Sequence, residues 1–171
     1  MKAEIIILNS KDRKHIRQTL NEQFGINEIP DNLVYFCLNK RERVYVCNKE
    51  IFDLDQEALR TNAFGLYFGT FMIDGFRLSL EGTQMIGPLA TKNIFEINDL
   101  QFEEYIKGEN LVCENEDFQK QYVIVKHNND FVGVGRVKEG IFSNHLSKSR
   151  KLKKVFNPND EESESSCDDS C

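Results

Sequence analysis

The sequence contains no tryptophan and no long apolar run near its start. Only four aliphatic residues follow one another there, Ile5 to Leu8, which is far short of the apolar core of a signal peptide or of a membrane span. We therefore expect an intracellular protein that has no contact with a membrane. Thirteen phenylalanines instead supply apolar surface for the core of an ordinary globular chain of 171 residues.

Closely paired cysteines are also missing. The chain has no CxxC pair among its five cysteines, which are Cys37, Cys47, Cys113, Cys167 and Cys171. The last two are spaced CxxxC with no histidine nearby, which is a weak metal signal. The sequence therefore predicts reduced thiols and no metal site.

The signatures of common nucleotide-using enzymes are absent. There is no GxxxxGK[ST] loop, no dinucleotide fingerprint after a strand and no glycine-rich methyl-donor loop. His15, His127 and His145 are scattered along the chain. Glu103 and Glu104 are sequence neighbours, so on a helix they would diverge by about 100°. We therefore expect a protein that is not an enzyme, with no catalytic residue and no cofactor.

Positive charge is concentrated in one stretch. Residues 136–154 contain one acidic residue, Glu139, and seven cations: Arg136, Lys138, Lys148, Arg150, Lys151, Lys153 and Lys154. The last fifteen residues hold six carboxylates and no cation; without those six the chain has 22 acidic and 22 basic residues. Such a cationic stretch indicates contact with a phosphate backbone, and the alternative is a charged face that is merely solvated.

The first part of the chain predicts a short strand over residues 4–8 and then a helix. Ile16, Leu20 and Phe24 recur every four residues, which gives the helix one apolar stripe. Ser10 is the expected N-cap, and Gly25 is the expected left-handed C-terminal cap. We expect this helix to cover one face of a sheet.

Two hairpins follow. The first is predicted over residues 33–47, with Leu38 opposite Arg43, and both of its faces are apolar. The second is rich in phenylalanine and is predicted to turn at Asp74-Gly75, a dipeptide favoured in two-residue turns. Pro88 then marks a plausible domain boundary.

The second part predicts a strand at residues 93–98, a short helix and a further hairpin. Asn98 and Gln101 have the spacing of a capping box, and Gly108 is expected to end the helix. Residues 122–138 read as two strands joined by a loop at residues 127–130. This order predicts a small, partly closed barrel with one helix near its mouth.

The fold class predicted is therefore α+β, with three parts. Residues 1–90 form an α/β domain, residues 91–156 form the small β pseudobarrel, and residues 157–171 form a disordered acidic tail. The tail could fold back over the basic stretch and compete with an anionic ligand, or it could simply increase solubility.

Two glycines stand inside a strand of the barrel. Gly133 and Gly135 lie in the run VGVGRV and are followed by Arg136 and Lys138. Glycine weakens a strand interior, so its presence suggests either a bulge or the close approach of another backbone. We expect an RNA backbone or base to approach here, since Arg136 can bind a phosphate or stack on a base.

The runs KNIFEINDLQFEEYIKGENLV and YVIVKHNNDFVGVGRVKEG resemble a PUA domain, an RNA-binding pseudobarrel. Upstream, YFGTF, GFRLSL and MIGPLA resemble the pre-PUA half of small two-domain proteins that assist large ribosomal subunit assembly, and similar tails occur on rRNA cytosine methyltransferases. The resemblance covers residues 33–151. It departs from that family in the acidic tail and in residues 114–121, which lack the usual glycine.

The resemblance implies an RNA site in the groove beside the helix and the last strands. The positions it carries over are Lys107, Gly108, Gly133, Gly135, Arg136 and Lys138. The cationic stretch adds Lys148, Arg150 and Lys151 to the expected RNA-binding residues.

The function expected from these observations is non-catalytic binding of RNA, in particular of rRNA during ribosome biogenesis. The partners expected are that RNA, ribosome-assembly proteins or an RNA-modification enzyme, in the cytoplasm or, in a eukaryote, in the nucleolus. The alternative is a protein-docking or RNA-binding accessory subunit of an RNA-modification enzyme, with the phenylalanine-rich hairpin as its docking face.

Overall fold

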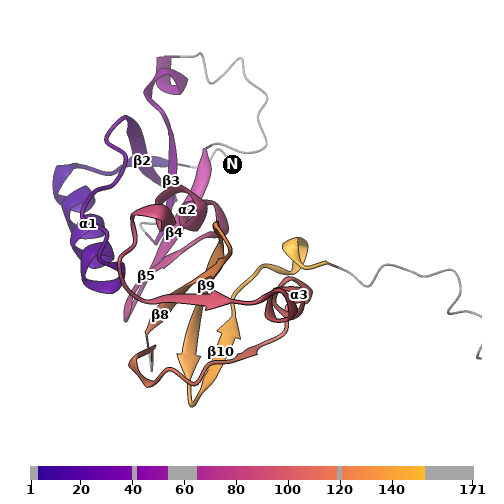
Figure 1. The fold of residues 1–171 in the computed structure, drawn as a ribbon. Coiled ribbons are helices and arrows are strands. Elements are labelled where there is room, and N and C mark those ends of the chain that lie inside the picture. The colour runs from indigo at the N-terminus through magenta and orange to yellow at the C-terminus, as the bar shows by residue number, and fades with distance from the viewer. Residues whose placement is uncertain (1–3, 40–41, 54–64, 119–120, 153–171) are drawn as a thin grey trace, which may run out of the picture.

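The computed structural model describes residues 4–39, 42–53, 65–118 and 121–152. These residues form an α+β fold of two five-stranded sheets (Figure 1), so the predicted fold class is confirmed. The predicted acidic tail lies outside the described residues, as do Lys153 and Lys154.

The first sheet is antiparallel throughout, and its strands follow one another in chain order. They are β1 (Ile5–Ile7), β2 (Leu33–Leu38), β3 (Arg43–Asn48), β4 (Leu66–Met72) and β5 (Gly75–Leu78). A 3-10 turn, η1 (Lys49–Asp53), follows β3. Cys37 pairs with Val44 in the first hairpin, which is the register predicted from Leu38 opposite Arg43.

Helix α1 (Ser10–Phe24) covers one face of this sheet, as predicted, with Ile16, Leu20 and Phe24 fully buried in the core. The helix N-cap is Asn9 rather than the predicted Ser10. The Asn9 side chain accepts hydrogen bonds from the first turn, and the Asp12 carboxylate accepts one from the Asn9 N–H at 3.1 Å. These two reciprocal hydrogen bonds make Asn9 the N-cap, one residue before the predicted Ser10.

The second hairpin turns at Ile73-Asp74 and not at the predicted Asp74-Gly75. Met72 pairs with Gly75, and Phe71 pairs with Phe76. This register brings the Phe71 and Phe76 rings edge to face at 5.1 Å and buries Phe76 completely. Aromatic packing across the strands therefore sets the turn.

The phenylalanine-rich hairpin keeps its largest rings inside. Phe68 and Phe76 are both 0 % exposed, and Phe71 packs partly buried against the same core. The exposed apolar side chains of this hairpin are Leu66, Met72 and Ile73. Burial of the rings removes most of the aromatic surface on which the alternative docking role depended.

The second sheet has the order β6-β8-β9-β10-β7, with β6 parallel to β8 and the other pairs antiparallel. Its strands are β6 (Ile94–Ile97), β7 (Leu111–Val112), β8 (Tyr122–His127), β9 (Asp130–Lys138) and β10 (Ile141–Asn144). The sheet curls, and helix α3 (Asp99–Lys107) lies at its side (Figure 1). Two 3-10 turns, η3 (Glu116–Phe118) and η4 (Lys148–Arg150), complete this part of the chain.

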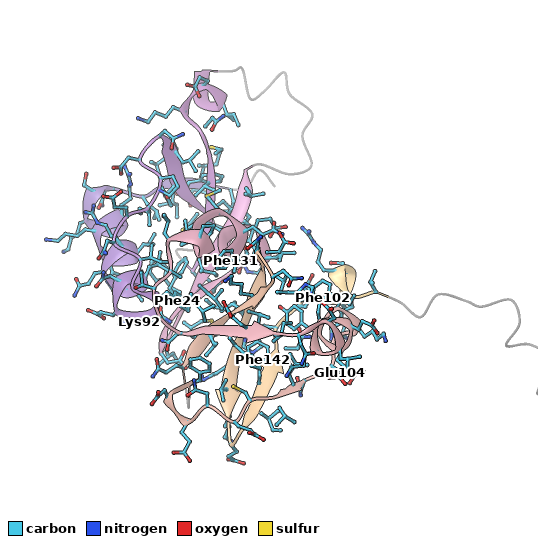
Figure 2. All side chains as sticks on the ribbon, in the orientation of Figure 1. Phe24, Lys92, Phe102, Glu104, Phe131 and Phe142 are labelled. Carbon is cyan, nitrogen blue, oxygen red and sulfur yellow. The ribbon has the colours of Figure 1, made fainter. Side chains whose placement is uncertain are left out.

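Helix α2 (Leu80–Ile86) and the turn η2 (Gly87–Leu89) connect the two sheets. The helix packs against β4 of the first sheet and β9 of the second. Phe131 of β9 lies near α2, whereas Phe142 lies within the curl of the second sheet (Figure 2). Segments far apart in sequence thus meet around α2.

Strand β8 is shared by two hydrophobic cores because its side chains alternate. Tyr122 and Ile124 pack into the core of the first sheet, whereas Val123 and Val125 pack inside the second. The strands of the two sheets fall on either side of residue 90, yet one core joins them. The predicted domain boundaries stay a prediction.

Candidate nucleic-acid interface

Helix α3 is fixed at both ends by the caps that the sequence predicted. The Asn98 side chain accepts from the N–H of Gln101 at 3.0 Å, and the Gln101 side chain accepts from the N–H of Asn98 at 3.1 Å. At the other end Gly108 is left-handed, with φ 91, and its N–H donates to the Tyr105 carbonyl at 2.9 Å. Lys107 is exposed in the last turn, where a cation favours the helix dipole.

The C-terminal segment, residues 145–152, is hydrogen-bonded to the end of α3. Lys151 Nζ donates to the Gly108 carbonyl at 3.2 Å, and the Leu152 N–H donates to the Ile106 carbonyl at 2.9 Å. Figure 1 shows this segment, with η4, beside α3. Asn144, at the end of β10, anchors it further, since its Nδ2 donates to the Tyr105 carbonyl at 2.7 Å.

These bonds gather five of the predicted residues, which we call the basic face: Lys107, Gly108, Lys148, Arg150 and Lys151. Lys107 lies 3.9 Å from Glu103, an exposed pair that contributes little energy. Lys148 is exposed, and no carboxylate in the described part of the chain pairs with it. Lys107 and Lys148 are therefore open to an anionic ligand.

A cleft of about 390 Å³ adjoins the basic face. Residues from β4, β5 and the start of α2 line one side, and residues from α3, β9 and the C-terminal segment line the other. We call it the inter-sheet cleft; its lining residues include Tyr67, Arg77, Leu80, Glu81, Tyr105, Gly133, His145, Leu146, Ser147, Ser149 and Arg150. Arg150 belongs to both the basic face and the cleft, so one ligand can reach both.

The cleft is more cationic than anionic. Arg77 and Arg150 line it, and Glu81, the carboxylate among its lining residues, is ion-paired with Arg150. Desolvation lowers the pKa of His145 below its ordinary value, and the Arg77 and Arg136 charges lower it further. A phosphate entering the cleft would meet a positive potential.

A side chain at either glycine of β9 would point into the protein, which corrects the prediction that RNA approaches the main chain at Gly135. A Cβ at Gly135 would lie 2.1 Å from Phe142 Cζ and 2.4 Å from the Ser143 carbonyl oxygen. A Cβ at Gly133 would lie 2.2 Å from the Tyr105 hydroxyl oxygen. Their missing side chains therefore make room for protein, although Gly133 also lines the inter-sheet cleft.

Arg136 also faces inward, toward the first sheet, because it shares a face of β9 with Val134. Its guanidinium forms an ion pair with Asp74 in the β4–β5 turn and lies 5.7 Å from the centre of the Tyr122 ring. The Tyr122 hydroxyl donates to Asp74 at 3.3 Å. The structure therefore gives Arg136 a role in joining the two sheets.

Lys138 is not brought to the basic face. It ends β9 and pairs with Ile141 at the start of β10, whereas the basic face lies beyond the other end of β10, at Asn144. Its Nζ is 3.5 Å from Glu139 and its side chain is exposed. Of the nine predicted residues, six contribute to the basic face or the cleft, and Gly135, Arg136 and Lys138 lie elsewhere.

Sequence reasoning missed the first-sheet side of the cleft. Arg77 lies between Phe76 and Leu78, which are both buried, so alternation along β5 already placed Arg77 on the opposite face. Glu81 and Tyr67 gave no comparable signal, because only the packing of α2 against β4 and β9 brings them to the site.

Within the described ranges, no group of three or more histidine, cysteine or acidic side chains is placed to hold a metal ion. None of the helices in those ranges has the length and apolar character needed to cross a bilayer. Cys37, Cys47 and Cys113 are buried.

The second sheet lies in the part of the chain that matches a known protein family. Residues 92–152 match the family model described as the methyltransferase RsmF PUA domain. No curated protein matches the chain. The matched residues run from just before β6 to just after η4 and include the whole basic face, and a PUA domain points to RNA binding in general. Residues 92–152 are therefore similar to a PUA domain of the kind found in rRNA methyltransferases.

Proposed function

We propose that this protein binds structured RNA through the basic face and does no chemistry on it. The observation that carries the proposal is the convergence of Lys107, Lys148, Arg150 and Lys151 at the end of α3 within a PUA domain. The hydrogen bonds from residues 151 and 152 to α3 fix the backbone that carries Lys148, Arg150 and Lys151 beside the end of that helix. A fixed set of cations can match the phosphates of a folded RNA.

Binding to the phosphate backbone has a defined electrostatic signature. Four neutralised phosphates release condensed counterions, so the logarithm of affinity should fall with the logarithm of salt with a slope of about −3. Arg150 can contact a phosphate with two parallel hydrogen bonds, whereas each lysine acts as a point charge.

We further propose that the RNA is rRNA and that binding serves ribosome biogenesis. The resemblance of residues 33–151 to small pre-PUA and PUA proteins of large-subunit assembly supports this choice.

Crosslinking in cells followed by sequencing of the bound RNA tests the choice of ligand. We expect crosslinks concentrated in one region of rRNA or of its precursors, and we expect them to be lost when Lys107 and Lys148 are both changed to glutamate. Crosslinks spread evenly over all cellular RNA would contradict the rRNA proposal, and an absence of crosslinks would contradict RNA binding.

A further inference from the structure

The inter-sheet cleft has the size of a small-molecule site. Its volume, about 390 Å³, is at the lower end of the range for ligand pockets, roughly 300–1,000 Å³. A double helix cannot enter a space of this size, whereas one nucleotide can. Both sheets contribute walls, and helix α2 and the shared core hold those walls together.

The cleft combines apolar and polar walls. Leu80, Leu146 and Tyr67 are among the lining residues that can supply apolar surface for a planar base. Ser147 and Ser149 lie at the other wall, with their hydroxyl oxygens 3.1 Å apart, and both residues are exposed. Hydroxyl groups of this kind can donate to phosphate or ribose oxygens.

Arg77 gives the cleft a cation that does not belong to the basic face. No carboxylate in residues 4–39, 42–53, 65–118 and 121–152 forms an ion pair with it. It is partly buried on β5, where a phosphate contact would be screened less than one on the open surface. Arg150 lines the same cleft and is ion-paired with Glu81, so a phosphate that displaces this carboxylate can be held by two guanidinium groups.

We propose that the inter-sheet cleft binds one unpaired, unstacked nucleotide of the RNA, with its phosphate held by Arg77 and Arg150 and its base against Leu80, Leu146 and Tyr67. This inference rests on the proposed function and adds to it a preference for RNA with unpaired loops. Bases splayed out of loops are the usual targets of sequence-specific RNA recognition, because a duplex hides them.

Two RNAs of equal length test this inference, one a hairpin with an unpaired loop and the other a fully paired duplex. We expect Arg77→Ala to weaken binding of the hairpin about tenfold, since a charge-assisted contact is lost, and to leave duplex binding within twofold of wild type. Arg17→Ala is the matched control, because Arg17 is exposed on α1, on the other face of the first sheet, and should change neither affinity.

A second variant fills the cleft without disturbing the core. Ser147 is exposed and makes no cap hydrogen bond, so Ser147→Trp should fold normally and should also weaken hairpin binding selectively. Equal losses on hairpin and duplex, or no loss on either, with both variants folded, would overturn the inference.

Titration with free nucleoside monophosphates distinguishes a cleft that binds free nucleotides from one that binds a nucleotide of RNA. If the monophosphates shift the NMR signals of His145 and Ser147 but neither variant changes hairpin affinity, the cleft binds free nucleotides and the RNA inference is wrong. If wild-type protein binds neither the hairpin nor the duplex, the proposed function itself fails, which is a distinct outcome.

Discussion

The hydroxyl group of Tyr105 fills the space that a side chain at position 133 would need. An ideal Cβ at Gly133 would lie 2.2 Å from that oxygen, and the φ of Gly133, +148°, is one that other residues rarely adopt. The hydroxyl donates to the Val132 carbonyl at 3.3 Å, and Tyr105 is 1 % exposed. Gly133 thus allows helix α3, and with it the basic face, to dock closely on β9.

Gly133→Ala should therefore act on stability. The added methyl group meets a buried oxygen and the backbone is strained, so we expect a loss of roughly 2–4 kcal/mol in the free energy of unfolding. For a chain of this size the melting temperature should fall by roughly 5–15 °C. Thermal and urea unfolding followed by circular dichroism measure both quantities.

A second substitution distinguishes this explanation from an RNA contact. Tyr105→Phe removes the hydroxyl, and the next atom, Cζ, is 3.4 Å from the Cβ position, which is ordinary contact. The double variant should be less destabilised than the sum of the two single variants. A Gly133→Ala protein with normal stability but lost RNA affinity would restore the original prediction.

Arg136→Ala should lower stability with little effect on RNA affinity, because the side chain is ion-paired to Asp74 and lies over Tyr122. Both ionic side chains are more than a third exposed, so solvent screening limits the loss to about 0.5–1 kcal/mol. Asp74→Ala should lower the free energy of unfolding by a similar amount, and the double variant should lower it by little more than either single variant. If Arg136→Ala instead lowered RNA affinity tenfold at unchanged melting temperature, this assignment would be wrong.

Glu81→Gln should tighten RNA binding several-fold at low salt. The Glu81 carboxylate neutralises Arg150, and a phosphate must compete with it for the same guanidinium. Removing the charge frees Arg150 and makes the cleft more positive. Fluorescence anisotropy with a labelled RNA measures the change. Glu96→Gln is the matched control, because the Glu96 carboxylate on β6 is exposed and pairs with Lys126 of β8, and it should leave affinity unchanged.

His145 should make the fold less stable in mild acid. Its pKa is lowered by desolvation and by Arg77 and Arg136, so the unfolded chain binds the proton more readily than the folded one. Stability from this group is therefore present above the unfolded pKa, about 6.5, and is lost as pH falls toward the folded pKa. Urea unfolding at pH 7.5 and 5.5 should show a smaller drop for His145→Gln than for wild type; equal drops would contradict the assignment.

Charge reversal locates the RNA surface. Lys107→Glu with Lys148→Glu should reduce RNA affinity at least tenfold at about 0.1 M salt, because two phosphate contacts become repulsions. Lys138→Glu makes the same kind of change at an exposed position away from the basic face and should alter affinity less than twofold. Equal losses in the two proteins would show that net charge, and not this face, determines binding.

Local signals in the sequence predicted much of the fold. The Asn98 capping box, the left-handed caps Gly25 and Gly108 and the register of β2 with β3 depend on near neighbours, and the structure has all of them. The family resemblance located the second sheet.

The rest depended on contacts between distant segments. In the sequence, Gly135 and Arg136 have the pattern expected of a strand that faces RNA. In the structure, Arg136 forms an ion pair with Asp74, and Phe142 occupies the space beside Gly135, and both partners come from other parts of the chain. Arg77 reaches the cleft for the same reason, through the packing of the two sheets around α2. Contacts of this kind, between residues far apart in the chain, cannot be predicted from local patterns in one sequence.

The most direct test of RNA binding by the basic face is the salt dependence of affinity for a folded rRNA fragment. Wild-type protein should show a log-log slope of about −3, and the Lys107→Glu, Lys148→Glu double variant a clearly shallower one, with the Lys138→Glu slope unchanged. An affinity that does not respond to salt, or the same slope in all three proteins, would contradict the account.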